Sequence, residues 1–330
     1  MYLKATNLTK KYGSKVAVAG IDIEIIPGRI LGLLGPNGAG KSTTIKMLSG
    51  QTAPSGGEIA VGFGSEKGGE GANEKDGKSY SALPPSLRKQ IGVMPQELII
   101  WEDMNIKENL EFTASLQGMR ASDAKRRRDY LIEALHLERE LKTLARNLSG
   151  GYKRRLNLAV SIIHEPKLVF LDEPTPGIDA QSRRFLMDFV QDMGSQEDQS
   201  IVLTDHYLDE AEKLSDYVVI IDQGKIVTEG TIPEIKHRHG DGNILSIDLA
   251  SEHAGNSELV EKIKAKAKKK GMELTKSKSS LTTIVKDPVG SIQTAIAVLE
   301  ESDAEALNIS VKEPTLEDIF LLLTGKEIRE

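Results

Sequence analysis

The sequence has no cysteine and no long apolar run, and each absence narrows what the chain can be. Without cysteine among its 330 residues, the chain forms no disulfide bond and offers no thiolate to a metal, a composition that fits a reducing compartment. Its longest apolar runs, such as 30–34 and 319–323, fall far short of the roughly 20 residues that a membrane-spanning helix needs. We therefore expect a soluble protein that can still dock on a membrane partner.

The chain also lacks a charge excess and an apolar leader. Its 43 Lys and Arg residues are nearly balanced by 49 Asp and Glu residues, for a net charge of −6, so composition does not favour a nucleic-acid partner. The opening, MYLKATNLTK, lacks the apolar core of a secretory signal peptide. A length of 330 residues exceeds one ordinary domain, and we expect two.

The first 236 residues alternate between strand and helix patterns. Expected strands are 3–8, 17–26, 29–35, 168–171, 200–204, 217–221 and 225–229. Expected helices are 41–48, 106–116, 120–135, 138–144, 208–214 and one that follows 180. The run 30–34 is apolar on both faces, as in a buried parallel strand, and the glycine-rich stretch 62–86 predicts a flexible surface insert. This alternation predicts an α/β fold around a parallel sheet with covered faces.

A break at 237–242, HRHGDG, precedes a second alternating pattern in 243–330. Its expected strands are 244–249, 281–285 and 307–311, and its expected helices are 257–270, 291–300 and 316–323. We predict that this part forms a small C-terminal α/β domain.

The stretch GPNGAGKS, 35–42, fits the phosphate-loop pattern G-x-x-x-x-G-K-[ST] between an expected strand and an expected helix. Its glycines permit a tight loop whose N–H groups converge on phosphates, and the helix N-terminus adds partial positive charge. Lys41 would reach the β- and γ-phosphates, and the Ser42 hydroxyl would ligate Mg²⁺. A simple glycine-rich turn is the alternative, but chance produces this pattern in only about one such chain in a hundred. The motif therefore predicts nucleotide binding.

Two adjacent acids follow the apolar strand in LVFLDEP, 168–174. Packing explains them poorly, because a buried carboxylate needs a partner. As functional residues, Asp172 would lie in the Mg²⁺ sphere and Glu173 would orient or deprotonate the attacking water. An ordinary strand end with solvated acids is the alternative, which the upstream Lys41 disfavours.

The phosphate loop, LSGG at 148–151 and LVFLDE at 168–173 stand in the order and spacing of the ATP-binding cassette (ABC) ATPases. The chain resembles that family nearly throughout 1–235. The resemblance implies a P-loop cassette over about 1–236, with a mixed sheet core and a helical signature subdomain near 103–160. It also implies ATP and Mg²⁺ as the bound groups.

The resemblance gives roles to residues that would say little alone. Tyr12 matches the aromatic residue that stacks on adenine, and Gln96 matches the glutamine that contacts Mg²⁺ and the attacking water. Asp179 matches the aspartate of the loop after the acidic pair, and His206 matches the histidine that contacts the γ-phosphate. Taken singly, Tyr12 and His206 would more often be structural residues. The implied nucleotide-binding set in the loop is Gly35, Pro36, Asn37, Gly38, Ala39, Gly40, Lys41, Ser42 and Thr43.

The signature LSGG implies a partner chain. In the family, Ser149, Gly150 and Gly151 would contact the γ-phosphate of ATP bound to the other subunit. The chain has one phosphate loop and one signature, so a second copy or a paralogue must complete each site, with two ATP molecules between head-to-tail cassettes. Two residues depart from the family pattern. Tyr152 stands where a polar residue is usual, and Pro176 stands where serine is commoner.

Two segments indicate a branch of the family. DHYLDEAEKLSDYVVIIDQGKIVTEGT, 205–231, and EPTLEDIFLLLTG, 313–325, resemble cassettes of drug, sodium, polysaccharide and lipid exporters. In that group the membrane-spanning permease is a separate polypeptide, so the resemblance implies an ATPase on the cytoplasmic face of the membrane. Trp101, within 99–105, lies where such cassettes dock the permease. An exposed anchor and a core tryptophan both remain open for Trp101.

The alternative is a non-transport ABC protein that acts on ribosomes or DNA. Such proteins carry tandem cassettes or a long coiled coil, and 103–146 is too short for that coil. The basic stretches 125–128 and 262–270 are the best nucleic-acid candidates, but lysines at helical spacing usually form a solvated face. We therefore expect no nucleic-acid partner.

Overall fold

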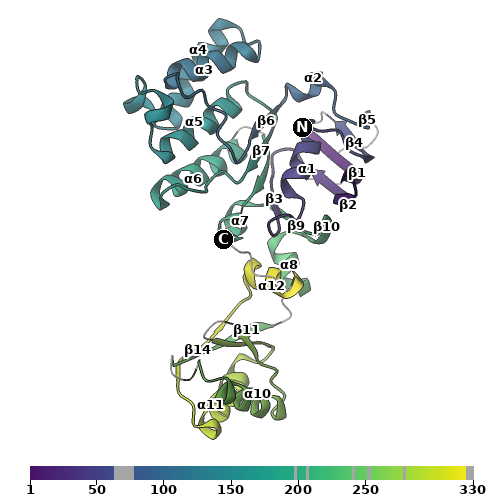
Figure 1. The fold of residues 1–330 in the computed structure, drawn as a ribbon, viewed down its shortest axis with the longest axis vertical. Helices are drawn as coiled ribbons and strands as arrows, with labels where there is room; N and C mark the ends of the chain where they lie inside the picture. Colours follow the sequence, from purple (N-terminus) through teal and green to yellow (C-terminus); the bar gives the residue numbers. More distant parts are fainter. Residues whose placement is uncertain are drawn as a thin grey trace. The chain divides into compact units, whose positions relative to one another are not determined.

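The computed structural model describes residues 1–62, 78–196, 199–205, 208–239, 242–250, 253, 255–277 and 280–324. They form two compact units, one built from Met1–Ile232 and the other from Pro233–Leu323 (Figure 1). Across the described residues, no helix is both long enough and apolar enough to cross a bilayer.

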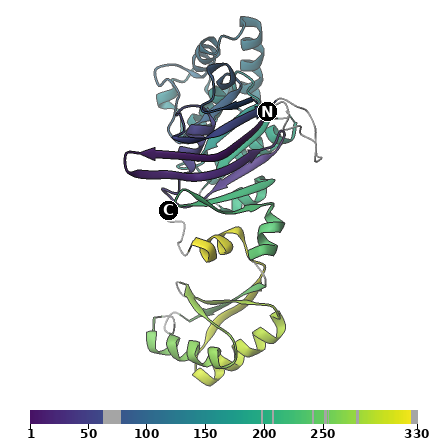
Figure 2. The ribbon, with the colours of Figure 1, turned by 90° about the vertical axis from the view of Figure 1, so that its right-hand side faces the viewer.

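An antiparallel sheet of order β2-β1-β4-β5 forms one layer of the first unit. Its strands are β1 (Tyr2–Tyr12), β2 (Lys15–Ile25), β4 (Gly56–Gly62) and β5 (Lys78–Tyr80). The long β1–β2 hairpin is the purple ribbon in Figure 2. Both hairpin strands run beyond their predicted limits of 3–8 and 17–26, because their backbones continue to pair as far as Tyr12 and Lys15.

Part of the predicted insert 62–86 is not a surface loop. Residues 63–77 lie outside the described part of the chain. Strand β5, however, pairs with β4 in the register Ile59–Tyr80, and Tyr80 packs against the apolar core. Helix α2 (Pro85–Arg88) then begins with proline at its first turn. The strand was missed because its pairing partner lies upstream of the glycine-rich stretch.

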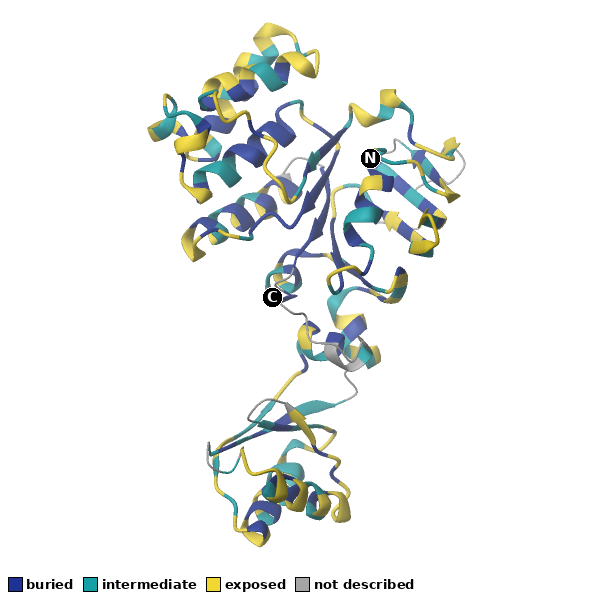
Figure 3. Ribbon diagram, in the orientation of Figure 1, coloured by how far each residue is buried: buried dark blue, intermediate teal, exposed yellow. Residues whose placement is uncertain are grey.

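The central sheet has the order β10-β9-β3-β8-β7-β6. Its strands are β3 (Ile30–Leu34), β6 (Ile91–Met94), β7 (Leu168–Asp172), β8 (Ser200–Thr204), β9 (Tyr217–Asp222) and β10 (Lys225–Gly230). The first five of these are parallel, and β10 runs antiparallel to β9. Every residue of β3, β7 and β8 is buried, as the dark blue strands of Figure 3 show. The carboxyl ends of these three neighbouring strands meet at one edge, where open α/β sheets bind ligands.

Alternate strand residues divide between two apolar clusters, one on each face of this sheet. Leu168 and Phe170 face β1, β2 and α1, whereas Val169 and Leu171 face the helices on the other side. The helices are α1 (Lys41–Leu48), α3 (Ile106–Leu116), α4 (Ala121–Ala134), α5 (Gly150–Ile162), α6 (Ala180–Gln196) and α7 (Leu208–Leu214). In Figure 1 helices α3, α4, α5 and α6 gather on one side of the sheet.

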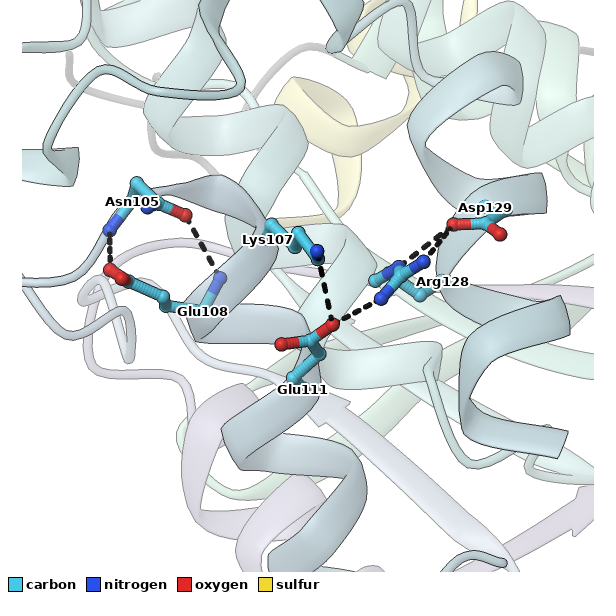
Figure 4. A network of polar contacts seen from close by, with 6 residues as sticks. All are labelled: Asn105, Lys107, Glu108, Glu111, Arg128 and Asp129. Carbon is cyan, nitrogen blue, oxygen red and sulfur yellow. Dashed lines mark hydrogen bonds and ion pairs between the residues drawn. The ribbon is translucent and has the colours of Figure 1, made fainter. Parts of the chain in front are cut away.

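Helices α3 and α4 are joined by a polar network on their solvent face (Figure 4). Arg128 of α4 donates to Glu111 of α3 and to Asp129 beside it, while Lys107 approaches the same Glu111 carboxylate at 3.8 Å. Asn105 and Glu108 form a reciprocal capping box at the start of α3. Arg128, the last residue of the basic stretch 125–128, thus joins this helix pair.

The predicted helix 138–144 is wrong, because only a short 3₁₀ turn forms at Glu138–Glu140. The Thr143 hydroxyl bonds the Glu140 carboxylate, and the chain then extends so that Leu144 bridges Asn105. A non-local backbone pairing thus replaces the local helix.

The second unit is a β-α-β-β-α-β module with sheet order β12-β13-β11-β14, all antiparallel. This is the ferredoxin-like arrangement. Its core elements are β11 (Asn243–Leu249), α10 (Ser257–Lys269), β12 (Thr275–Ser277), β13 (Ser280–Val285), α11 (Pro288–Ser302) and β14 (Ala306–Lys312). Helices α8 (Ile232–His239) and α12 (Leu316–Thr324) flank them. Since α8 continues to His239, the predicted break at 237–242 begins later than expected.

Three lysines of the basic stretch 262–270 bind a neighbouring helix. Lys262 and Lys266 donate to the last carbonyls of α11, and Lys270 reaches the Glu301 carboxylate at 2.7 Å. Cations at a helix C-terminus are favoured by the helix dipole. This stretch therefore stabilises the α10–α11 pair.

Candidate functional site

The phosphate loop connects β3 to α1, and its glycines are required by close neighbours. Gly35 has φ +154°, and a Cβ there would lie 2.1 Å from the carbonyl oxygen of Ile221. At Gly40, with φ +113°, a Cβ would lie 2.7 Å from the carbonyl of Ala17. Strands β2 and β9 thus press against the loop and hold it in a shape that side chains would prevent.

Lys41 is buried inside this loop. Its ammonium group donates to the carbonyl oxygens of Gly35, at 2.7 Å, and Pro36, at 3.3 Å. Burial lowers the pKa of Lys41 below its ordinary value, while the carboxylates of Glu173, Asp172 and Asp205 oppose that shift. One positive charge therefore lies among three carboxylates at the ends of β7 and β8.

The acidic pair is buried, with Asp172 7% and Glu173 6% exposed, so it is not a solvated strand end. Thr204 joins the two residues, because its hydroxyl donates to Asp172 Oδ1 at 2.8 Å and accepts from the Glu173 N–H at 3.0 Å. Glu173 has φ +50°, a left-handed conformation that is uncommon outside glycine. Thr204 and the buried Asp205 were not singled out from the sequence, although both stand directly before His206.

This donor set fits a magnesium ion that arrives with a nucleotide. Carboxylate and hydroxyl oxygens are hard ligands, and the three carboxylates outnumber the single ammonium group. Among the described residues, no cluster of three or more His, Cys, Asp or Glu side chains forms a cage that could hold a metal by itself. Mg²⁺ is commonly bound by one or two carboxylates together with substrate phosphates.

The signature segment begins helix α5. Ser149 is the N-cap residue, whose hydroxyl accepts from the Tyr152 N–H. A Cβ at Gly151 would lie 2.3 Å from Ser182 Oγ, at the start of α6. Asp179 accepts from the Ser182 N–H at 2.9 Å, and hydrogen bonds from Ser182 lower the pKa of Asp179. Gly151 therefore has a steric role within its own chain, which sequence analysis did not foresee.

Tyr152, a departure from the family pattern, packs within the helical layer. The guanidinium carbon of Arg155 lies 5.1 Å from the centroid of the Tyr152 ring and 4.5 Å from that of Phe185 on α6. The cation between two rings ties α5 to α6. Nothing in the structure accounts for Pro176.

The remaining predicted residues lie on different elements. Tyr12, at the end of β1, exposes 50% of its surface, and the Lys10 ammonium lies 5.2 Å from its ring centroid. Gln96 follows β6, and its carbonyl accepts from Arg154 Nη1 at 2.7 Å. His206 lies outside the described residues. Trp101 is 51% exposed and meets Phe112 edge-on, so it is not a core tryptophan.

Comparison with known proteins identifies the family. Residues 18–176 match the family model described as ABC transporter. The linearmycin resistance ATP-binding protein LnrL of Bacillus subtilis (strain 168) is 33% identical, over 99% of this chain and 100% of that protein. The chain belongs to the ABC transporter family. The Nod factor export ATP-binding protein I of Ralstonia nicotianae is 31% identical to this ABC protein, over 99% of the chain and 95% of the relative.

A solved structure agrees on the fold. The dimeric post-hydrolysis structure of the ATP-binding cassette MJ0796, bound to ADP and Pi, has a TM-score of 0.59 and 21% identity. It covers 69% of the ABC chain and 98% of MJ0796. The predicted α/β cassette fold is confirmed. Both relatives are named as resistance or export proteins, so a role on ribosomes or DNA gains no support.

Proposed function

We propose that this ABC protein hydrolyses ATP to drive export through separate membrane-spanning subunits. One observation carries the proposal: the phosphate loop with its buried Lys41 follows β3, the buried pair Asp172 and Glu173 ends β7, and β8 alone separates these strand ends at one edge of the sheet. The names of the relatives support export as the process that ATP serves.

The proposed roles follow the chemistry of each group. The N–H groups of 35–43 cradle the phosphates, and Lys41 leaves its two carbonyl partners to meet the β- and γ-phosphates. Ser42, Asp172 and Gln96 hold Mg²⁺, which would neutralise phosphate charge. Glu173 takes or orients the proton of the attacking water.

Three further contacts complete the proposed site. The exposed ring of Tyr12 stacks on adenine. Asp179 lies at the edge of the site, and His206 contacts the γ-phosphate. Ser149, Gly150 and Gly151 complete the site of a second copy or a paralogue, an arrangement supported by the dimeric form of MJ0796.

The exposed Trp101 is the proposed anchor for a permease at the cytoplasmic face of the membrane. That permease would determine which compound is transported. Co-purification from cells with a multi-span membrane protein is the expected result, and co-purification with ribosomes or DNA instead would refute the transport assignment.

The ATPase activity is tested by Glu173→Gln. This change keeps the shape of the side chain but removes the carboxylate, so phosphate release should fall about 100-fold or more. ATP binding should persist, and Mg-ATP should trap the dimer, measured by size-exclusion chromatography. Wild-type rates of phosphate release from the variant would show that Glu173 has another role.

A further inference from the structure

Helix α5 binds the segment after Gln96 through two polar side chains on one face. Arg154 Nη1 donates to the Gln96 carbonyl at 2.7 Å, and Asn157 Oδ1 accepts from the Ile99 N–H at 2.8 Å. Residues three apart on a helix lie side by side. These two hydrogen bonds therefore attach residues 96–99 to helix α5, which begins with the signature.

Helix α3 holds the other end of the same segment. The fully buried amide of Asn109 accepts from the Trp101 N–H at 2.7 Å and donates to the carbonyls of Trp101, at 3.0 Å, and Met104, at 3.1 Å. Buried hydrogen bonds of this kind fix a single geometry, because leaving either partner unpaired is costly. Residues 96–104 are thus bound at both ends by helices of the signature layer.

The Arg154 guanidinium also interacts electrostatically with Glu173 of the acidic pair. Burial lowers the pKa of the Arg154 guanidinium, and the Glu173 carboxylate opposes that shift. The Arg154 side chain therefore bonds the backbone of Gln96 and also interacts with the carboxylate of Glu173, the residue proposed to act on the attacking water. The sequence alone predicted no contact of Arg154 with Gln96 or Glu173.

We propose that Arg154 is a positioning residue that links the signature helix to Gln96 and Glu173. Its hydrogen bond sets the backbone from which the Gln96 side chain departs, and its charge attracts the Glu173 carboxylate. It touches no phosphate in this scheme and acts through those two residues. Because Asn157 holds Ile99 from the same helix, a movement of α5 also carries the exposed side chains of Leu98, Ile99 and Trp101.

The inference rests on the proposed ATPase function, and kinetics supply its first test. Arg154→Gln should lower kcat for ATP about 10-fold or more, as small misplacements of catalytic groups do, with KM changed less than about twofold. Arg154→Lys keeps the charge and one donor and should recover most of the rate. Arg126→Gln makes the same change at an exposed ion-paired site on α4 and should match wild type.

A spectroscopic test uses the single tryptophan of the chain, Trp101, which lies on the gripped segment. Arg154→Gln should increase acrylamide quenching of Trp101 without nucleotide, and Arg126→Gln should not. In the wild type Mg-ATP should shift Trp101 emission, and in Arg154→Gln that shift should be lost. Thermal melts identify any variant that fails to fold. If Arg154→Gln does not fold, Arg154→Met, which keeps the aliphatic stem without the charge or a donor, replaces it in both measurements.

The outcomes separate the two proposals. If the wild type releases no phosphate from ATP, the proposed function fails. Trp101 quenching without nucleotide would still show whether Arg154 holds the segment 96–104. If the wild type is active and Arg154→Gln keeps its kcat and its Trp101 quenching, the positioning role is refuted. A rise in KM with unchanged kcat would equally refute it, because Arg154 would then serve binding.

Discussion

At the scale of single residues, Thr204 holds both members of the acidic pair in place. Its one hydroxyl donates to the carboxylate of Asp172 and accepts from the backbone of Glu173. This fixes the position of both acids, and Glu173 adopts a left-handed backbone beside it. The motif revealed the acids, but not the hydroxyl group from the next strand.

Replacing Thr204 by valine keeps the shape of the side chain and removes both hydroxyl bonds. We expect a loss of about 1–3 kcal/mol in the free energy of unfolding, because the buried Asp172 carboxylate loses a donor, whereas the Glu173 N–H keeps its bond to the Thr204 carbonyl at 3.2 Å. Phosphate release should fall with it, as Asp172 loses its orientation. Denaturant titration and steady-state hydrolysis measure the two effects. Thr204→Ser keeps the hydroxyl and is the control, and a fully active valine variant would contradict this role.

Gly151→Ala tests whether that glycine serves its own chain. The added methyl would lie 2.3 Å from Ser182 Oγ and 2.9 Å from Ser182 Cβ, so we expect about 1–3 kcal/mol of destabilisation from overpacking. The neighbouring Gly150→Ala meets its nearest atom only at 3.3 Å and should cost much less. Thermal melts without nucleotide give the comparison. Adding Ser182→Gly should restore Gly151→Ala, and a failure to restore it would exclude the clash.

At the scale of elements, the sequence predicted those helices and strands that are marked by residues adjacent to one another in the chain. Helix α3 was predicted at 106–116 and strand β8 at 200–204, and the structure shows local signals at both: a capping box of Asn105 and Glu108, and the apolar run 201–203. Elements defined by distant partners were missed, such as β5, which exists by pairing with β4. The site followed the same division. The phosphate loop and the acidic pair are contiguous in sequence, whereas the contacts of Thr204 and Arg154 span strands and helices.

The stability of the folded chain should depend on pH through Asp179, which precedes the first turn of helix α6. Hydrogen bonds from Ser182 lower the pKa of Asp179, so this carboxylate stabilises the folded chain fully above its ordinary pKa of 3.8. That contribution is lost as the pH falls through the lower folded value. Asp179→Asn retains a capping acceptor without the charge, so its melting temperature should fall less than that of the wild type over this acidic range. Parallel slopes in nucleotide-free melts would contradict the assignment.

At the scale of the whole molecule, the chain carries half of each proposed site. Lys41 lies at the sheet edge with the acidic pair, whereas Ser149 caps α5, and the next signature residues include Gly151, which packs against Ser182 of its own chain. The signature thus has a structural contact in its own chain and a proposed phosphate contact in another. The first was visible only in the structure, and the second rests on the family.

Two inactive variants can show whether the sites are shared. Ser149→Arg places a bulky cation at the signature and should abolish hydrolysis while leaving ATP affinity of the isolated chain nearly unchanged. Lys41→Ala should lose phosphate binding at its own loop. Mixed as head-to-tail pairs, the intact loop of one chain meets the intact signature of the other, so random pairing should recover up to about a quarter of wild-type phosphate release. If each chain used its own signature, every site in the mixture would still lack one part, and the mixture would stay inactive.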